Sequence, residues 1–501
     1  MKRYTRLLAM LMAVLMVASM FAACGGSEDP ATTTTAATTT AATTTEATTT
    51  AGTTTAATTT EATTTEATTT EATTTPEPAV DLDGYVLSIV NGASLLPAMN
   101  ADGSYTNSLQ EEYADKLLDL EAEYGFTVEA MDKPEGDFIE TMTAAALAGI
   151  SYGDVAYEQQ YRVWPLAKNN AVIPLDGDVA VAAGFDWSNE ECWFQPVTVW
   201  SEMWDHVWGV SVGGQYVAPA TGYFVTFNKE ICAAAGYSDL YQLVRDHEWT
   251  WDVYLEIAEH ATQDTDGDGV TDQWGTGATA WGSEVVSNGV QFCGERDGKW
   301  QLTIDSDAGI EALQFLYDMN YGTGTCDLVA SNNEKRQMFS DGKVAFNWAD
   351  MGRLMGEFYT ASTHEYGIIP MPMGPRAEEY VSVVSGVAFI HIPSTNKNLE
   401  KTVAALNAWA PIVNDIDAYA ETMTDGRCPT DEDMEMMVEY IIPNFALNMG
   451  RITPDIWSVV DDNDEGGGMI NDISYNGMTP AQAIEHNRSV INAALDMFFG
   501  Q

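Results

Sequence analysis

Hydrophobic and polar positions follow a regular order where the globular part of the chain begins. Alternating apolar residues over 84–90 predict a buried strand, and 126–130 and 154–157 predict two more. The segments between them, 109–124 and 138–147, place apolar residues on one face with carboxylates around them, as amphipathic helices do. A β-α-β-α-β order predicts a parallel sheet with helices on its faces, so the fold class is α/β.

The first 80 residues lack this periodicity. Residues 1–23 open with three basic side chains and continue as an uncharged apolar run, which predicts a signal peptide, with a retained membrane anchor as the alternative. The tetrad 21–24 (FAAC) resembles the lipobox of bacterial lipoproteins, which implies lipidation of Cys24. Residues 24–80 carry Thr-rich pentads without an apolar face at any period, so we expect a disordered stalk, of a composition typical of O-glycosylated tracts.

Charge narrows the range of partners. The chain has 501 residues with 74 Asp and Glu against 21 Lys and Arg, a formal net charge of -53. Phosphates of nucleic acid and anionic lipid headgroups would repel such a surface, which excludes nucleic-acid binding and direct binding to a lipid surface. We expect a monomer that contacts the membrane only through the lipid on Cys24.

The cysteines beyond Cys24 give no disulfide framework. They are odd in number and none has CxxC spacing, so buried small hydrophobes are the expected role, with one or two bridges left open. These residues are Cys192, Cys232, Cys293, Cys326 and Cys428.

Six short motifs follow one another through residues 81–501. They are GISYGDV with PLD (149–155, 174–176), GQYVAP with FNKE (214–219, 227–230), WTWD with DTDGDG (249–252, 264–269), FSDGKVA (339–345), YGIIPMP with SGVA (366–372, 385–388) and NGMTP (476–480). In this order they resemble the family 1 extracellular solute-binding proteins of ABC sugar importers. Phe227 departs from the Tyr usual at its position, and 177–213 is unusually rich in Trp.

The resemblance implies a two-lobed fold of the periplasmic-binding-protein type (type II), with a ligand cleft between discontinuous lobes. Carried onto this chain, the first lobe takes 81–225 plus 349–405, and the second takes 226–348 plus 406–501. Closure of the two lobes about a hinge when ligand binds is the expected motion.

Candidate ligand residues lie in the segments that reach the cleft in the resembling family. Flat aromatic rings can stack on the apolar faces of a sugar while polar side chains bind its hydroxyls. Tyr157, Glu158 and Gln159 are expected to follow the third strand, whose carboxyl end is where such sheets bind ligands. The remaining candidates are Tyr223, Trp281, Trp348, Asp350, Ser385 and Gly386. The Trp residues of 187–208 line one wall of the cleft or form a hydrophobic cluster under a long loop.

An Asp-rich loop has the spacing of an EF-hand calcium site in its first nine positions. Its expected ligands are Asp264, Asp266, Asp268, the Val270 carbonyl and Asp272. Gly275 stands where the bidentate Glu belongs, so calcium would bind more weakly than in a sensor protein. The alternative to a calcium site, to which we give equal weight, is an Asp-rich turn between a helix ending near 261 and a strand at 273–274.

These observations predict a lipid-anchored receptor on the extracellular face of the bacterial cytoplasmic membrane. It would bind a sugar or oligosaccharide, deliver it to an ABC permease, catalyse no reaction and require no cofactor. A cell-surface glycan-binding or adhesion protein with a calcium-dependent loop, or a surface glycoside hydrolase, are the alternatives. The net charge argues against an anionic ligand, although Arg162 or Arg353 could reverse this within the cleft.

Overall fold

The structure is a computed structural model that describes residues 80–217, 222–279, 282–354, 356–415, 418–419, 427–461 and 468–500. The predicted signal peptide, Cys24 and the stalk lie outside the described residues, as does Trp281. In the described part of the chain, no helix is both long enough and apolar enough to cross a membrane.

The first sheet has four strands in the order β13-β3-β1-β2, with bounds β1 (Val86–Val90), β2 (Thr127–Met131), β3 (Val155–Gln159) and β13 (Ala388–His391). β1 pairs in parallel with both β2 and β3, which confirms the predicted β-α-β-α-β unit. β13 pairs with β3 in the antiparallel sense and extends that strand to Gln159. The predicted strand at 154–157 already holds Tyr157, but the expectation that Glu158 and Gln159 follow the strand is wrong, because both lie within it.

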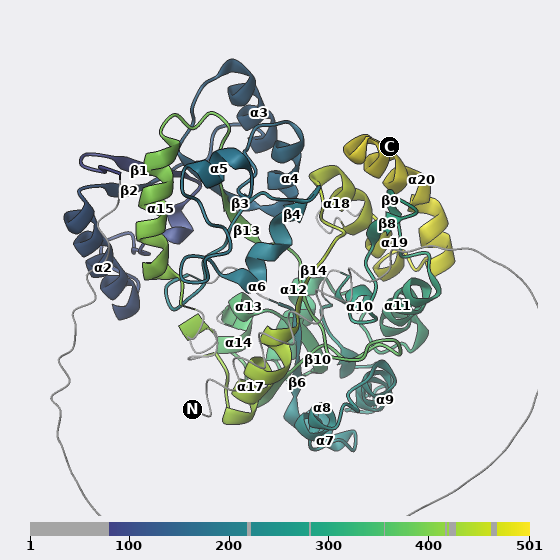
Figure 1. Cartoon of the computed structure of the whole chain (residues 1–501). Coiled ribbons are helices and arrows are strands. Elements are labelled where there is room, and N and C mark those ends of the chain that lie inside the picture. The colour runs from purple at the N-terminus through teal and green to yellow at the C-terminus, as the bar shows by residue number, and fades with distance from the viewer. Residues whose placement is uncertain are drawn as a thin grey trace, which may run out of the picture. The chain divides into compact units, whose positions relative to one another are not determined.

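The helices beside this sheet begin and end at residues suited to those positions. In α2 (Ser108–Tyr124), the Asn107 side chain accepts a hydrogen bond from the Gln110 N–H at the start, and Gly125 ends the helix at φ 73°. α3 (Phe138–Ala148) is capped in the same way by Asp137 and ends at Gly149, φ 67°. Although remote in sequence, α15 (Leu399–Val413) lies beside α2 and β1 (Figure 1).

The second sheet has the order β11-β6-β10-β7, with bounds β6 (Phe224–Asn228), β7 (Trp274–Thr276), β10 (Val344–Ala349) and β11 (Tyr366–Ile369). Every residue of β6 and β10 is buried, as expected for the central strands of a sheet covered on both faces. β10 runs antiparallel to β6 and parallel to β7. Helix α9 (Trp251–Ala261) packs against β7 and β10.

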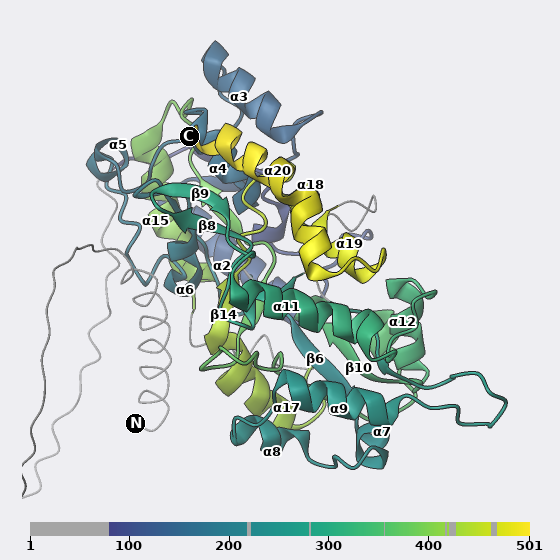
Figure 2. The same cartoon turned by 90° about the vertical axis from the view of Figure 1, so that its right-hand side faces the viewer.

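The remaining elements surround these two sheets (Figures 1 and 2). The other helices are α4 (Gln160–Lys168), α5 (Asp178–Ala182), α6 (Gln195–Thr198), α7 (Lys229–Ala234), α8 (Leu240–Arg245), α10 (Ser283–Val286), α11 (Asp307–Tyr317), α12 (Asn332–Ser340), α13 (Met351–Leu354), α14 (Glu357–Thr360), α17 (Asp431–Glu435), α18 (Pro454–Asp461), α19 (Met469–Ser474) and α20 (Pro480–Phe499). Three two-stranded pairs join β4 (Glu202–Met203) to β5 (His206–Val207), β8 (Cys293–Arg296) to β9 (Lys299–Leu302), and β12 (Ser382–Val384) to β14 (Phe445–Leu447).

The chain passes between the two sheets more than once. Within 349–405, β11 joins the second sheet and β13 joins the first. Within 406–501, the last part of α15 packs with the first sheet, whereas α20 packs with α11, α18, α19 and β9. Each predicted lobe consists of two separate segments of the chain, and the boundaries of these segments stay a prediction.

Buried apolar side chains form two clusters. The smaller cluster lies between the first sheet, α2 and α15, where the Trp409 indole donates to the Tyr113 hydroxyl at 3.1 Å. The larger cluster contains both faces of the second sheet. The Trp-rich segment contributes to both clusters: Trp193 and Trp208 are buried, and Trp204 packs on Phe498 at 5.6 Å. The tryptophans of this segment that are buried therefore serve as core residues.

The cysteines of the described chain are all free thiols. Four are buried and Cys428 is half-buried. Burial raises the pKa of Cys428 to about 12, and that of Cys192 to about 11. The thiols therefore stay protonated at neutral pH, which matches their expected role as small hydrophobes.

Candidate functional site

Glu158 forms the centre of a polar group at the carboxyl ends of the parallel strands. Its carboxylate accepts from the Asn91 amide at 3.1 Å and pairs with the Lys133 ammonium at 3.0 Å and the Arg162 guanidinium at 2.6 Å. Asn91 directly follows β1 and Lys133 lies just past β2, so the ends of three neighbouring strands meet at one carboxylate. This is the edge at which open α/β sheets bind ligands.

The negative charge of Glu158 attracts the positive charges of Lys133 and Arg162. Glu158 is only 2% exposed, whereas Lys133 and Arg162 reach solvent. Burial acts to lower the pKa of Arg162, but the hydrogen bond and the negative charge of Glu158 outweigh it, so this pKa lies above its ordinary value. Glu158 therefore holds two cationic side chains in fixed positions at the sheet edge.

Gln159, Ser385 and Gly386 come together where β3 passes into α4. The Gln160 side chain accepts from the Val387 N–H at 2.9 Å, which fixes the loop that precedes β13 against α4. A Cβ on Gly386 would lie 3.2 Å from the Gln159 amide oxygen, so glycine lets the two segments approach closely. The Ser385 hydroxyl is buried and has no hydrogen-bond partner among the described residues, so its donor and acceptor capacity is unused.

Tyr223, Asp350 and Arg353 form a second group, at the ends of β6 and β10. Asp350 directly follows β10 and accepts from the Arg353 N–H at 2.9 Å, and its carboxylate also pairs with the Arg353 guanidinium. That guanidinium lies over the Tyr223 ring, 5.5 Å from its centroid. Burial acts to lower the pKa of Arg353, but Tyr223 and Asp350 raise it above the ordinary value. The cation therefore stays charged beside an aromatic face.

Trp348 is the predicted site residue that the structure places deepest. It lies in β10, is 1% exposed and belongs to the larger apolar cluster. Its indole N–H has no partner of hydrogen-bond geometry, although the Tyr254 hydroxyl is near enough for the indole to offset slightly the rise in the Tyr254 pKa that burial causes. The structure thus places Trp348 in the apolar core and not at a surface.

A tilted pair of aromatic rings with an arginine over each ring joins α4 to α18, and sequence reasoning missed it. The Tyr161 and Trp457 rings lie 5.3 Å apart at 53°, and the Arg451 guanidinium lies 4.1 Å above Trp457. Arg162 lies over the other ring, 5.2 Å from the Tyr161 centroid. Trp457 is half-buried, so part of its ring faces solvent. The one signal in the sequence was that Tyr161 closely follows Glu158.

Three carboxylates of the Asp-rich loop come together. One oxygen from each of Asp264, Asp266 and Asp268 lies within 4.8 Å of the others. The loop follows α9 and precedes β7, as predicted. Asp264 accepts from the N–H of Gly267 at 2.7 Å and of Gly269 at 2.7 Å, which draws the loop around its carboxylate. The fourth predicted carboxylate, Asp272, instead accepts from the hydroxyl and N–H of Thr265.

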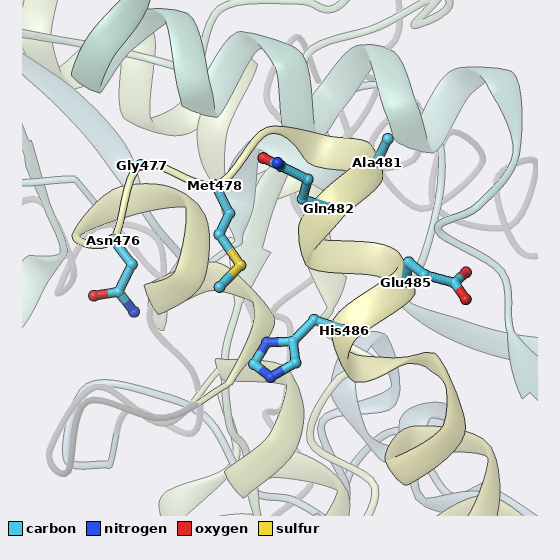
Figure 3. Close-up of a pocket in the computed structure, with 7 residues that line it drawn as sticks. All are labelled: Asn476, Gly477, Met478, Ala481, Gln482, Glu485 and His486. Carbon is cyan, nitrogen blue, oxygen red and sulfur yellow. The ribbon is translucent and has the colours of Figure 1, made fainter.

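A shallow pocket lies elsewhere, between α19 and the start of α20 (Figure 3). It is lined by Asn476, Gly477, Met478, Ala481, Gln482, Glu485 and His486. None of these is a predicted ligand residue. His486 pairs with Asp472 at 2.8 Å, so the polar groups of this pocket serve to hold α20 against α19.

The sequence model of the bacterial extracellular solute-binding proteins matches residues 100–410. Since this is more than half of the chain, the protein belongs to that family, whose members are binding proteins located outside the cytoplasm. A comparison with curated protein sequences finds no significant match.

Solved structures of two-lobed solute-binding proteins share the fold, which confirms the predicted fold class. UspC of Mycobacterium tuberculosis is 17% identical, with a TM-score of 0.56, over 82% of this chain and 100% of that one. UgpB of Mycobacterium tuberculosis, solved with glycerophosphocholine, is 16% identical, with a TM-score of 0.56, over 83% and 98%. The cyclic alpha-maltosyl-1,6-maltose binding protein of Arthrobacter globiformis is 14% identical, with a TM-score of 0.54, over 83% and 100%.

Proposed function

We propose that the protein is the sugar receptor of an ABC importer, tethered outside the cytoplasmic membrane by a lipid on Cys24. The observation that carries this proposal is the tilted Tyr161–Trp457 ring pair close to Glu158, because it combines aromatic rings with placed polar groups at the edge of a parallel sheet. Several structures of the same fold were solved with or named for oligosaccharides, including mannotriose, maltotetraose and cyclic alpha-maltosyl-1,6-maltose.

The proposed mechanism is binding without chemistry. A sugar lies with its apolar face on the exposed part of Trp457 while Glu158, Arg162 and Ser385 bind its hydroxyls. α4 packs against β3 and β13 of the first sheet, whereas α18 packs with α19 and α20. A ligand that contacts α4 and α18 therefore draws the first sheet and the C-terminal helices together. The closed form then docks on a permease, which takes up the sugar with every covalent bond intact.

A thermal-shift screen of mono- and oligosaccharides tests the function. Ligand binding to the folded state alone raises the melting temperature, by an amount that grows with the logarithm of the ligand concentration. We expect at least one sugar to raise it, and the recovered sugar to be chemically unchanged by chromatography. A flat screen would contradict the receptor assignment, and new products would favour the surface glycoside hydrolase instead.

We propose further that the Asp-rich loop binds one calcium ion weakly, through Asp264, Asp266 and Asp268. With the bidentate Glu absent, we expect a dissociation constant of about 10⁻⁴–10⁻³ M, the range of extracellular calcium modules. Calorimetric titration should show one site in the parent chain and none in Asp266→Ala. Replacing Asp252, an acidic residue at the start of α9 outside the loop, with Ala should leave the titration unchanged. Identical traces for the parent and Asp266→Ala would end the calcium interpretation.

A further inference from the structure

Arginines of this acid-rich chain are commonly held by carboxylates. Arg245 pairs with Glu435 at 2.7 Å, Arg376 pairs with Glu311 at 2.7 Å, and Arg488 pairs with Asp305 at 2.5 Å. With 74 acidic residues for 21 basic ones, an arginine without a carboxylate partner is unexpected on numbers alone. Such an arginine therefore requires a physical explanation.

Arg336, on α12, makes no ion pair with any side chain that the structure describes. Among the described residues, its one hydrogen bond runs from Nη1 to the Asn333 side-chain oxygen at 2.8 Å. Its Nε is buried and finds no hydrogen-bond acceptor in the described part of the chain. A half-buried guanidinium with an unused donor is costly in the free protein, because Nε has lost water without gaining an acceptor and the neutral Asn333 amide does not balance the charge.

A second guanidinium adds to this cost. Burial, and then the positive charge of Arg353, lower the pKa of Arg336, while the Tyr359, Tyr223 and Asp350 side chains act in the opposite direction. The Asp350 carboxylate is already bound to Arg353. Of the carboxylates that the structure describes, Asp350 is therefore the one that acts on both arginines beside Tyr223.

We propose that the ligand carries an acidic group, a carboxylate or a phosphate or sulfate ester on a sugar, which Arg336 and Arg353 bind beside the Tyr223 ring. This deepens the proposed function and rests on it. The planar fork of a guanidinium matches the oxygens of these groups, and a bound anion supplies the partner that Arg336 lacks. A neutral sugar leaves the two cations unneutralised, so the pair selects against it.

Calorimetry with matched ligands tests the proposal. The pairs are galacturonate with galactose, glucose 6-phosphate with glucose, and trigalacturonate with α-1,4-galactotriose. We expect the acidic member of a pair to bind about tenfold to a hundredfold more tightly, since hydrogen bonds to a charged group are worth about 1.5–3 kcal/mol. Added salt should weaken the acidic member only. The pair that responds distinguishes a carboxylate from a phosphate ester.

Two results would count against the proposal in different ways. Equal affinities within every pair would overturn the acidic ligand and leave the sugar receptor intact. Absence of binding by all six sugars would overturn the acidic ligand and count against the receptor as well.

Variants at position 336 separate recognition from a structural role. Arg336→Gln should weaken the acidic ligand about tenfold to a hundredfold, and Arg336→Lys should recover part of this, because it keeps the charge but not the fork. Without ligand, Arg336→Gln should melt no lower than the parent, since it removes an unpaired charge. Arg376→Gln, which breaks an exposed ion pair with Glu311, is the matched control and should leave binding unchanged. A lower melting temperature for Arg336→Gln with unchanged acidic-sugar affinity would show a purely structural arginine.

Discussion

Replacement of Trp457 by alanine should weaken sugar binding about 30-fold to 1000-fold, because truncating an aromatic anchor at the centre of a binding site costs about 2–4 kcal/mol. The ring is half-buried and contacts both Tyr161 and Arg451, so it is held in place before ligand arrives. Trp457→Phe keeps a smaller aromatic face and should lose less. Calorimetry with the best sugar of the screen measures both.

The control for Trp457 is another stacked tryptophan. Trp300 on β9 is partly buried and stacks on Phe499 at 4.5 Å and 4°, outside the group around Glu158. Trp300→Ala should cost stability and leave the dissociation constant unchanged. Equal losses of affinity in Trp457→Ala and Trp300→Ala would show that general destabilisation, not stacking, explains the first result.

Acid should destabilise the folded chain through His391 by about 3 kcal/mol between pH 7 and pH 4. His391 lies in β13 with 0% exposure, and burial lowers its pKa from 6.5 to about 4. Its Nε2 has no hydrogen-bond partner, so no acceptor stabilises an added proton there. In the unfolded chain the same side chain takes up a proton near pH 6.5.

The sign follows from proton uptake. Between pH 6.5 and pH 4 the unfolded state holds a proton on this histidine that the native state does not, so the free energy of unfolding rises with pH. The stabilisation is complete above pH 6.5 and is lost as pH falls toward 4. Urea unfolding at a series of pH values measures the slope, which His391→Gln should make shallower. His260→Gln, at an exposed site on α9, should keep the parent slope; a parent slope in His391→Gln would contradict the account.

Local patterns predicted the first sheet well because each strand and helix carries its own signal. The helices predicted at 109–124 and 138–147 correspond to α2 and α3, which end at Gly125 and Gly149 in the structure. The error at Glu158 has a tertiary cause: β3 continues to Gln159 because it pairs with β13, more than 200 residues further along the chain. No local sequence pattern predicts the pairing of β3 with β13.

The candidate site was predicted only in part for the same reason. Tyr223 and Asp350 adjoin strands whose hydrophobic runs place them, so their neighbourhood was foreseeable. Trp457 and Arg336 lie on helices. An aromatic or basic residue is common there, so the sequence alone does not indicate a role in binding. The contact of Trp457 with Tyr161 joins segments that lie far apart in the sequence, and the charge of Arg353 reaches Arg336 only through the fold.

Small-angle scattering with and without the best sugar tests the central claim most directly. If the protein is a receptor that closes on its ligand, a saturating sugar should reduce the radius of gyration of the mature chain. Trp457→Ala at the same sugar concentration should keep the larger value. A radius of gyration that stays constant while calorimetry shows the sugar bound would contradict closure, and with it the receptor mechanism.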